Sequence, residues 1–368
     1  MQNMSETELR VELREAALTK RKENRELTWN KNRKNLGEYP RDELFSVEYI
    51  NEKVKLLKKQ RLSLEDYRYL PNALIQSEEN INAFLKVDQS LSSLISHLSG
   101  NDPTLQLYAA NCCCNISLGN TKACTALGKA VSSYLVAELE TLNYALLDVC
   151  IWTIGNLIAG SKKAFDILHS QYCLKYLILL LHKSDRSILS SVIYALLHYV
   201  HVGFYEIPEN QLSELVQVLI KPNFLYESPN SIWLLALLSS SAICTTNFYS
   251  ILPQVVDYLH STFSSNNGTA HCSEVTASIR ILANTLHNSC EEDKVDILLK
   301  NPKYSQEDLC LLLNKLLCHQ YIHVRKETLW LIGNLYNHRS SGINANVRNL
   351  IEFLPRINQA VLSIKHYA

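Results

Sequence analysis

The chain has 368 residues, of which 47% are hydrophobic and 20% are charged, so it is long enough to bury a large core. Its 10 Gly and 9 Pro are few for this length, which argues against a loop-rich or all-β fold. Basic and acidic residues are equal in number, 36 of each, so the overall charge indicates no class of partner.

The amino-terminal arm, residues 1–36, is far more basic than the rest of the chain. From Ala16 to Leu36, seven basic residues stand against Glu23 and Glu26, a local net charge of +5. Apolar residues at helical spacing predict an amphipathic helix from about Ser5 to about Lys34. A block of this kind is usually solvated and is often a binding arm. Its candidate binding residues are Arg14, Lys20, Arg21, Lys22, Arg25, Lys31, Arg33 and Lys34.

A charged segment, residues 37–70, follows the arm. The apolar residues Val54, Leu57, Leu62 and Leu64 are spaced as on an amphipathic helix. Because the end of a repeat array needs a polar outer face, we expect this segment to be a partly helical linker that caps the first repeat.

Residues 71–368 contain an internal repeat. Similar apolar helices, each followed by a polar break, place corresponding residues, here called the marker positions, at intervals of 41, 42, 39, 47 and 50 residues. The marker positions are Asn111, Trp152, Tyr194, Trp233, Arg280 and Trp330. A period near 42 is typical of armadillo or HEAT arrays, whose units have about 40–47 residues.

The helices inside the units have recognisable starts and ends. One helix is predicted from Cys173 to about His182 and the next from Ile188 to about His201, with Gly203 as the terminating residue. Asp102 before Pro103 is a helix start of the same kind. Because one such pair cannot bury its own apolar face, the units must stack into one continuous core.

The hexapeptide Trp-x-Ile-Gly-Asn-Leu occurs twice, from Trp152 and from Trp330. Its Trp and Asn are four residues apart, so Trp152 and Asn156, or Trp330 and Asn334, project from one helix face. A Trp ring attracts a cation, and an Asn amide pins the backbone of an extended peptide. Asp148, one turn before Trp152, adds negative charge, and Glu327 lies similarly near Trp330.

This Trp-x-x-x-Asn pair resembles the inner-helix motif of importin alpha, in which such pairs hold nuclear-localisation peptides. The likeness covers most of the chain after about residue 80. The stretches "LQLYAANCC", "SSYLVAEL", "DVCIWTIGNLIAGS" and "ETLWLIGNL" resemble in particular an importin-alpha-related group named for transmembrane and coiled-coil domains. The membrane part of that name has no support in this sequence.

The resemblance implies a cargo-binding groove on the concave side of the array. Its candidate residues are Asp148, Trp152, Asn156, Tyr194, Trp233, Asn284, Trp330 and Asn334. The ladder is broken, because only two of the six marker positions carry both Trp and Asn, and Arg280 would repel a basic ligand. The alternative interpretation is that these Trp and Asn residues pack one repeat against the next.

The arm resembles the importin-beta-binding segment of importin alpha. "VELREAALTKRKENRELTWNKNRKN" has the same order of a Val-Glu-Leu-Arg start, a basic cluster, a spacer and a second basic cluster. This resemblance implies importin beta as a partner. A solvated basic helix and a nucleic-acid patch are the alternatives, although aromatic interleaving and RNA-binding motifs are absent.

Motifs for catalysis, metals and membranes are missing. The sequence has no phosphate loop, no nucleophile elbow and no HExxH, so we expect no enzyme and no cofactor. Its eleven Cys form no zinc-finger spacing and are expected to pack in the core, and His198 with His201 is expected to be a surface pair rather than a metal site. No apolar stretch reaches the length of a membrane span.

We therefore expect an all-α, right-handed armadillo-repeat superhelix of about seven units, preceded by the basic arm. The leading functional hypothesis is a nuclear import adaptor in the cytoplasm and nucleus, with importin beta on the arm and a basic or extended protein cargo segment in the groove. The alternative is an armadillo scaffold for protein assembly with no transport role. No nucleic acid, membrane or metal is expected as a partner.

Overall fold

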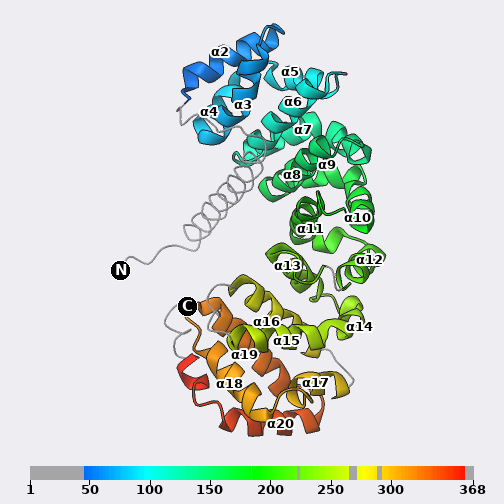
Figure 1. The fold of residues 1–368 in the computed structure, drawn as a ribbon, viewed down its shortest axis with the longest axis vertical. Helices are drawn as coiled ribbons and strands as arrows, with labels where there is room; N and C mark the ends of the chain where they lie inside the picture. Colours follow the sequence, from blue (N-terminus) through cyan, green and yellow to red (C-terminus); the bar gives the residue numbers. More distant parts are fainter. Residues whose placement is uncertain (1–44, 184, 222–223, 265–271, 288–291, 361–368) are drawn as a thin grey trace. The chain divides into compact units, whose positions relative to one another are not determined.

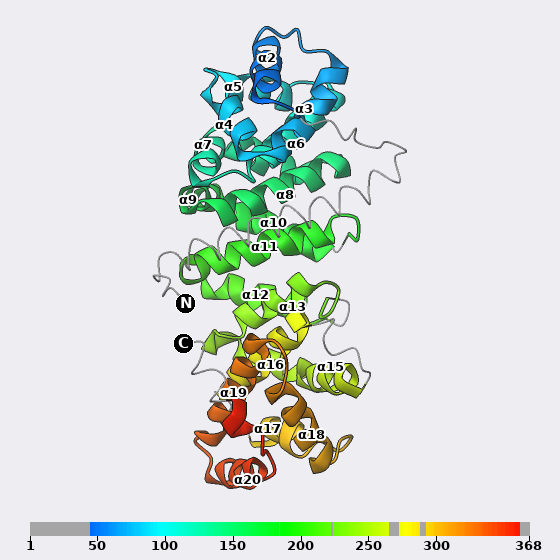
Figure 2. The same ribbon diagram turned by 90° about the vertical axis from the view of Figure 1, so that its left-hand side faces the viewer.

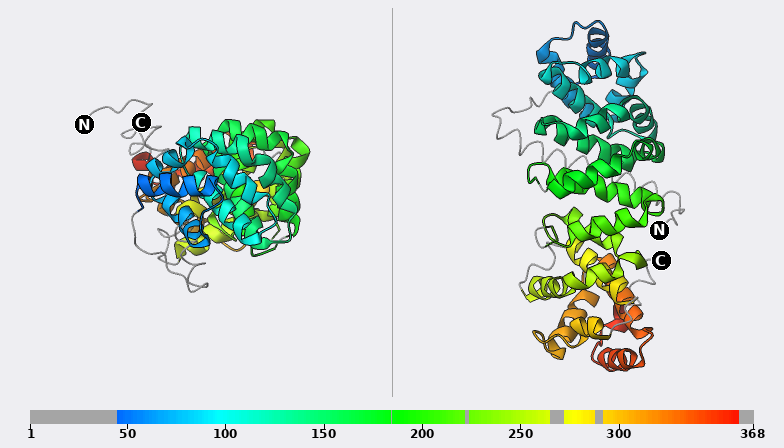
Figure 3. Two further views of the ribbon diagram at one scale, coloured as in Figure 1. Left: turned by 90° about the horizontal axis from the view of Figure 1, so that it is seen from above. Right: turned by 90° about the vertical axis from the view of Figure 1, so that its right-hand side faces the viewer.

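The computed structural model describes residues 45–183, 185–221, 224–264, 272–287 and 292–360. The basic arm, with all of its candidate residues, lies outside these ranges. The chain divides into two compact units, residues 1–202 and 203–368. In both units the elements drawn as coloured ribbons are helices (Figure 1, Figure 3), which confirms the predicted all-α class.

The helices of the first unit follow one another closely along the chain. They are α2 (Val47–Lys58), α3 (Leu64–Gln76), α4 (Glu78–Lys86), α5 (Ser90–Leu98), α6 (Pro103–Ile116), α7 (Thr121–Ala137), α8 (Tyr144–Gly160), α9 (Lys162–Ser170), α10 (Cys173–Lys183) and α11 (Leu189–Gly203). A short 3₁₀ helix, η1 (Glu138–Glu140), lies between α7 and α8.

The helices of the second unit begin after another 3₁₀ turn, η2 (Phe204–Glu206). They are α12 (Glu209–Leu219), α13 (Pro229–Leu238), α14 (Thr245–Phe248), α15 (Leu252–Ser264), α16 (Cys272–His287), α17 (Glu292–Leu299), α18 (Gln306–Leu317), α19 (Ile322–Tyr336) and α20 (Ser341–Glu352). The 3₁₀ turns η3 (Ala242–Cys244) and η4 (Tyr249–Ile251) flank α14.

The repeated unit consists of two shorter helices followed by a third helix. The sets α4–α5–α6, α9–α10–α11 and α17–α18–α19 have this form, whereas α7 alone fills the first two places before α8. The third helices among the described residues are α3, α6, α8, α11, α13, α16 and α19. Within each unit successive third helices pack on one another, as α6 and α8 do in the first and α13, α16 and α19 in the second (Figure 2).

Local sequence signals account for the helix boundaries. The side chain of Asp102 accepts hydrogen bonds from the backbone N–H groups of Thr104 and Leu105, at 2.8 and 3.2 Å, and thereby caps α6 as predicted. The predicted helices beginning at Cys173 and Ile188 are present as α10 and α11, and α11 ends at Gly203.

Residues 45–70, the described part of the segment predicted as a helical linker that caps the first repeat, contribute to the core of the first unit. Ile50, Val54 and Leu57 of α2 are fully buried against α4 and α5. A second helix, capped by Ser63, begins at Leu64, whose side chain is exposed rather than on the buried face. The boundary predicted at residue 70 falls inside this helix, α3, because its buried apolar face continues past that point.

Candidate binding face on the third helices

The six marker positions lie one on each of the third helices α6, α8, α11, α13, α16 and α19. Their exposure differs. Trp330 is 57% exposed, Tyr194 is buried at 7%, and Asn111, Trp152, Trp233 and Arg280 are half-buried. The repeat therefore places aromatic and charged side chains at the surface of most third helices, within each unit considered by itself.

In the first unit, the hexapeptide that begins at Trp152 contacts the next repeat. The ring of Trp152 lies 4.3 Å from the ring of Tyr194, measured between centroids, on α11. The hydroxyl of Tyr194 donates a 2.7 Å hydrogen bond to Oδ1 of Asn156. Asn156 is only 2% exposed, and its Nδ2 lies 3.9 Å from Sγ of Cys114 on α6. Its amide is thus enclosed between the neighbouring third helices.

The glycine of this hexapeptide has a packing role. A Cβ at Gly155 would lie 2.7 Å from two ring carbons of Tyr194 and 3.2 Å from Cα of Ala195. Real Cβ atoms do not approach other atoms so closely, so α8 and α11 meet at their observed separation only because residue 155 has no side chain.

Asp148 and Ser191 form a further link between α8 and α11. The hydroxyl of Ser191 donates a hydrogen bond to Oδ1 of Asp148, which is half-buried one turn before Trp152. The carboxylate that we expected near Trp152 is therefore on the same helix and is oriented by the next repeat.

In the second unit, the marker positions form a chain of contacts across three third helices. Nε1 of Trp233 on α13 donates a 2.6 Å hydrogen bond to Oγ of Ser273 on α16. The guanidinium of Arg280 on α16 lies 5.2 Å from the centroid of the Trp233 ring and forms an ion pair with Glu327 on α19.

The asparagine side chains of the third helices point back toward the preceding repeat. Asn115 donates to the carbonyl of Pro71, Asn284 to Oγ of Ser239 at 3.1 Å, and Asn334 to the carbonyl of Ala283 at 2.9 Å. Since buried polar groups must be paired, these amides stabilise the stacking of repeats. The sequence had suggested that the amides would bind the backbone of a ligand.

The second copy of the hexapeptide differs from the first in its surroundings. Trp330 is exposed, and a Cβ at Gly333 would have no atom within 4 Å. The same Trp-x-Ile-Gly-Asn-Leu motif thus gives a packed face on α8 and an open one on α19.

Two expectations about charge need correction. Arg280 does not present an isolated positive charge, because Glu327 pairs with it, and Glu327 acts on Arg280 rather than on Trp330. The sequence did not reveal three partners of these side chains, which are Ser191 for Asp148, Ser273 for Trp233 and Glu327 for Arg280. The repeat period would have found them, since these pairs are 43, 40 and 47 residues apart.

Seven of the described cysteines are buried as expected of core residues, whereas Cys272 and Cys310 are half-buried and Cys318 is exposed. Cys112, Cys113 and Cys114 are buried, and burial raises the pKa of the Cys113 and Cys173 thiols to about 12. Burial likewise holds the pKa of Cys150 well above its usual value. A thiol with so high a pKa remains protonated and is a poor nucleophile or metal ligand at neutral pH.

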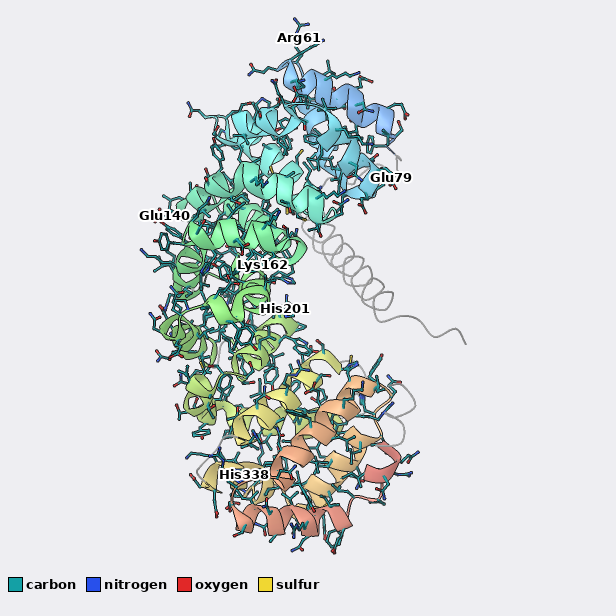
Figure 4. The ribbon with its side chains drawn as sticks, turned by 180° about the vertical axis from the view of Figure 1, so that it is seen from behind. Arg61, Glu79, Glu140, Lys162, His201 and His338 are labelled. Carbon is teal, nitrogen blue, oxygen red and sulfur yellow. The ribbon has the colours of Figure 1, made fainter. Side chains whose placement is uncertain are left out.

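The histidine pair on α11 is divided between packing and solvent. The ring of His198 packs edge-on against Tyr194 at 4.6 Å, whereas His201, labelled in Figure 4, is exposed. In the part of the chain that the structure describes, no cluster of three or more His, Cys, Asp or Glu residues is placed to hold a metal ion.

Across the described helices, none alone has the length and apolar character needed to cross a membrane. The segments Pro229–Leu238 and Ala242–Phe263 satisfy both criteria only when taken together, and they are bent by 107° relative to each other.

Replacing the two hexapeptide tryptophans by alanine should have unequal effects on stability. Trp152→Ala should lower the free energy of unfolding by about 1–2 kcal/mol, because it removes the ring contact with Tyr194 and part of the buried area. Trp330→Ala should change it by less than about 0.5 kcal/mol, as is usual for exposed residues. Urea unfolding followed by circular dichroism measures both, and equal losses would contradict the assigned environments.

No protein-family model matches the chain. Two engineered proteins of known crystal structure resemble it. One has a TM-score of 0.60 and 19% identity, over 77% of this chain and 67% of that protein. The other has a TM-score of 0.50 and 18% identity, over 66% of this chain and 97% of that protein. A designed armadillo-repeat protein in complex with the peptide (KR)4 matches with a TM-score of 0.42 and 16% identity, over 83% and 99%.

The fold is armadillo-like. The stacked three-helix units carry this conclusion. The similarity to the first engineered protein, at 19% identity, concerns the fold alone. The period near 42 residues had predicted it.

Proposed function

We propose that this armadillo-like protein is an importin-alpha-like nuclear import adaptor. It binds an extended segment of a cargo protein along the third helices and recruits importin beta through residues 1–36, and it moves between cytoplasm and nucleus. The observation that carries the binding half of the proposal is the recurrence of large aromatic or charged side chains at the marker positions, among them the exposed Trp330.

The contacts in the structure change how such a segment would be held. Asn156 is enclosed and bonded to Tyr194, so its amide is already used within the fold. Recognition by side-chain stacking on Trp330 and on the exposed part of Trp152 is supported better than pinning of the ligand backbone by amides.

The importin-beta half of the proposal rests on the arm's sequence, which lies outside the described residues. Two basic clusters separated by a spacer, in the order found in importin-beta-binding segments, support it. The remainder of the chain is close to neutral or slightly acidic, since the whole has no net charge. The arm is therefore the part best suited to an acidic partner.

Reversing three charges in the arm tests this half. Replacing Lys20, Arg21 and Lys22 by Glu should weaken binding to immobilised importin beta roughly a hundredfold, since three lost contacts of about 1 kcal/mol each give that factor. A chain lacking residues 1–36 should not bind. The control reverses Lys55, Lys58 and Lys59, which are exposed in and just after α2, and should bind as the wild type does.

Salt provides an independent readout of the same contact. Raising the ionic strength from 0.1 M to 1 M shortens the screening length from about 10 Å to about 3 Å and should weaken the wild-type interaction. If the variant with Glu at positions 20, 21 and 22 binds importin beta as tightly as the wild type does, importin beta contacts another surface of the chain.

The second candidate function is an armadillo scaffold for protein assembly without transport. The enclosure of Asn156 and the pairing of Arg280 with Glu327 favour it, because both use groups that an importin-type groove offers to its peptide. If the chain does not bind importin beta but still captures folded partner proteins, the scaffold is correct and the adaptor is not.

A further inference from the structure

Arg280 occupies the position that a cationic side chain of a ligand would take on the second unit. Its Nε lies 3.2 Å from Oε2 of Glu327, and its Nη2 bonds to Oε1 of the same carboxylate, so the pair is bidentate. The central carbon of its guanidinium lies over the Trp233 ring, 5.2 Å from the ring centroid. One residue thus meets both an aromatic ring and a carboxylate.

The two groups that hold Arg280 are themselves fixed in place. The hydrogen bond from Trp233 to Ser273 sets the orientation of the indole ring. The Glu327 side chain is only 15% exposed, and the Arg280 side chain is 35% exposed, so solvent reaches the cation from one side. An oriented indole beside a largely covered carboxylate is the arrangement that recognises Lys or Arg side chains.

We propose that Trp233 and Glu327 form a binding site for a cationic side chain and that Arg280 is its built-in occupant. As long as Arg280 is in place, a Lys or Arg of a bound segment meets a filled site whose carboxylate is already paired. The second unit therefore selects against basic residues at Trp233, whereas Trp152 in the first unit has the carboxylate of Asp148 one turn away. This specificity rests on the proposed binding of an extended segment, but the site itself does not.

Chemical rescue tests the site without any peptide. In full-length Arg280→Ala, the space left by the guanidinium should take up methylguanidinium, because ring and carboxylate remain. Millimolar methylguanidinium chloride should then raise the thermal midpoint of the variant saturably, as any ligand that binds the folded state does. Methylurea, a neutral analogue of similar shape, should not. If Arg280→Ala does not fold, Arg280→Gln, which retains much of the side-chain stem, serves instead.

A matched variant separates this effect from general salt effects. Arg348 on α20 also lies over an aromatic ring, 5.5 Å from the centroid of Tyr336. It forms no ion pair with the residues that the structure describes. Arg348→Ala should show no saturable rescue, and neither should the double variant Arg280→Ala with Glu327→Gln. Equal responses of all variants, or rescue by methylurea as well, would overturn the proposed site.

Peptide binding then tests the consequence for specificity. An eight-residue peptide of alternating Lys and Arg should bind Arg280→Ala about tenfold more tightly than the wild type, a factor that corresponds to about 1.4 kcal/mol. Adding Glu327→Gln should remove the gain. Unchanged affinity in Arg280→Ala would overturn the selective role of Arg280. Rescue by methylguanidinium without peptide binding to any variant would instead count against the proposed function and leave the site standing.

Discussion

Alanine at Asn156 should lower the free energy of unfolding by roughly 2–3 kcal/mol, because it removes a buried amide and the hydrogen bond that this amide accepts from the Tyr194 hydroxyl. Asn156 accepts the hydrogen bond from Tyr194 while almost completely enclosed, and its neighbours on α6 and α11 leave little room for water to replace the amide. Urea unfolding followed by circular dichroism measures the change. A loss below about 0.5 kcal/mol would place the side chain at the surface.

The equivalent residue in the second copy of the hexapeptide is the control. Asn334 is half-buried and donates one hydrogen bond to the carbonyl of Ala283, so Asn334→Ala should cost only about 1 kcal/mol. Tyr194→Phe removes the hydroxyl that donates to Asn156. The double variant Tyr194→Phe with Asn156→Ala should therefore lose less stability than the sum of the losses of the two single variants. A strictly additive pair would contradict the direct hydrogen bond.

Alanine substitutions at the two hexapeptide glycines should change stability in opposite directions. Gly155→Ala should cost about 1–3 kcal/mol, because its Cβ would overlap the buried ring of Tyr194 and crowd Ala195. Gly333→Ala meets open space and should stabilise α19 by up to about 1 kcal/mol, since alanine is the better helix former.

The glycine pair is a sensitive test because both substitutions are chemically identical and both fall at the same position of the Trp-x-Ile-Gly-Asn-Leu motif. Their thermal midpoints, measured on the full chain, should lie on opposite sides of the wild-type value. If Gly155→Ala is as stable as Gly333→Ala, then α8 and α11 do not approach each other as the structure describes, and the enclosure of Asn156 is in doubt as well.

Burial of the Asn side chains changes the meaning of the importin-alpha resemblance. The shared Trp and Asn positions are present in α8 and α19, but the contacts that they make differ between the copies. Of the residues that resemble peptide-binding positions of importin alpha, Asn156 is therefore the least suited to contact a peptide and the exposed Trp330 is the best suited. The proposed function accordingly depends more on the aromatic rings than on the amides.

Local signals in the sequence were enough to predict the class of fold and many helix boundaries. The predicted cap at Asp102 and the predicted end at Gly203 are decided by residues within one turn of the helix end. The period near 42 residues located the third helices, because every unit must present an apolar face to its neighbours. The burial of α2, in the segment expected to be a linker that caps the first repeat, depends on α4 and α5, which come later in the chain.

The sequence by itself determined that the chain is all-α and repetitive and which residue of each third helix takes the marker position, since helix periodicity and capping are short-range effects. Only the tertiary structure decided what those residues contact. Asn156 is enclosed and Gly155 is tightly packed because α11 lies against α8, whereas Gly333 in the second copy of the motif faces open space. Arg280 is neutralised because stacking brings Glu327, 47 residues away, to its guanidinium. Such contacts between repeats depend on how the helices stack, and no window of local sequence contains that information.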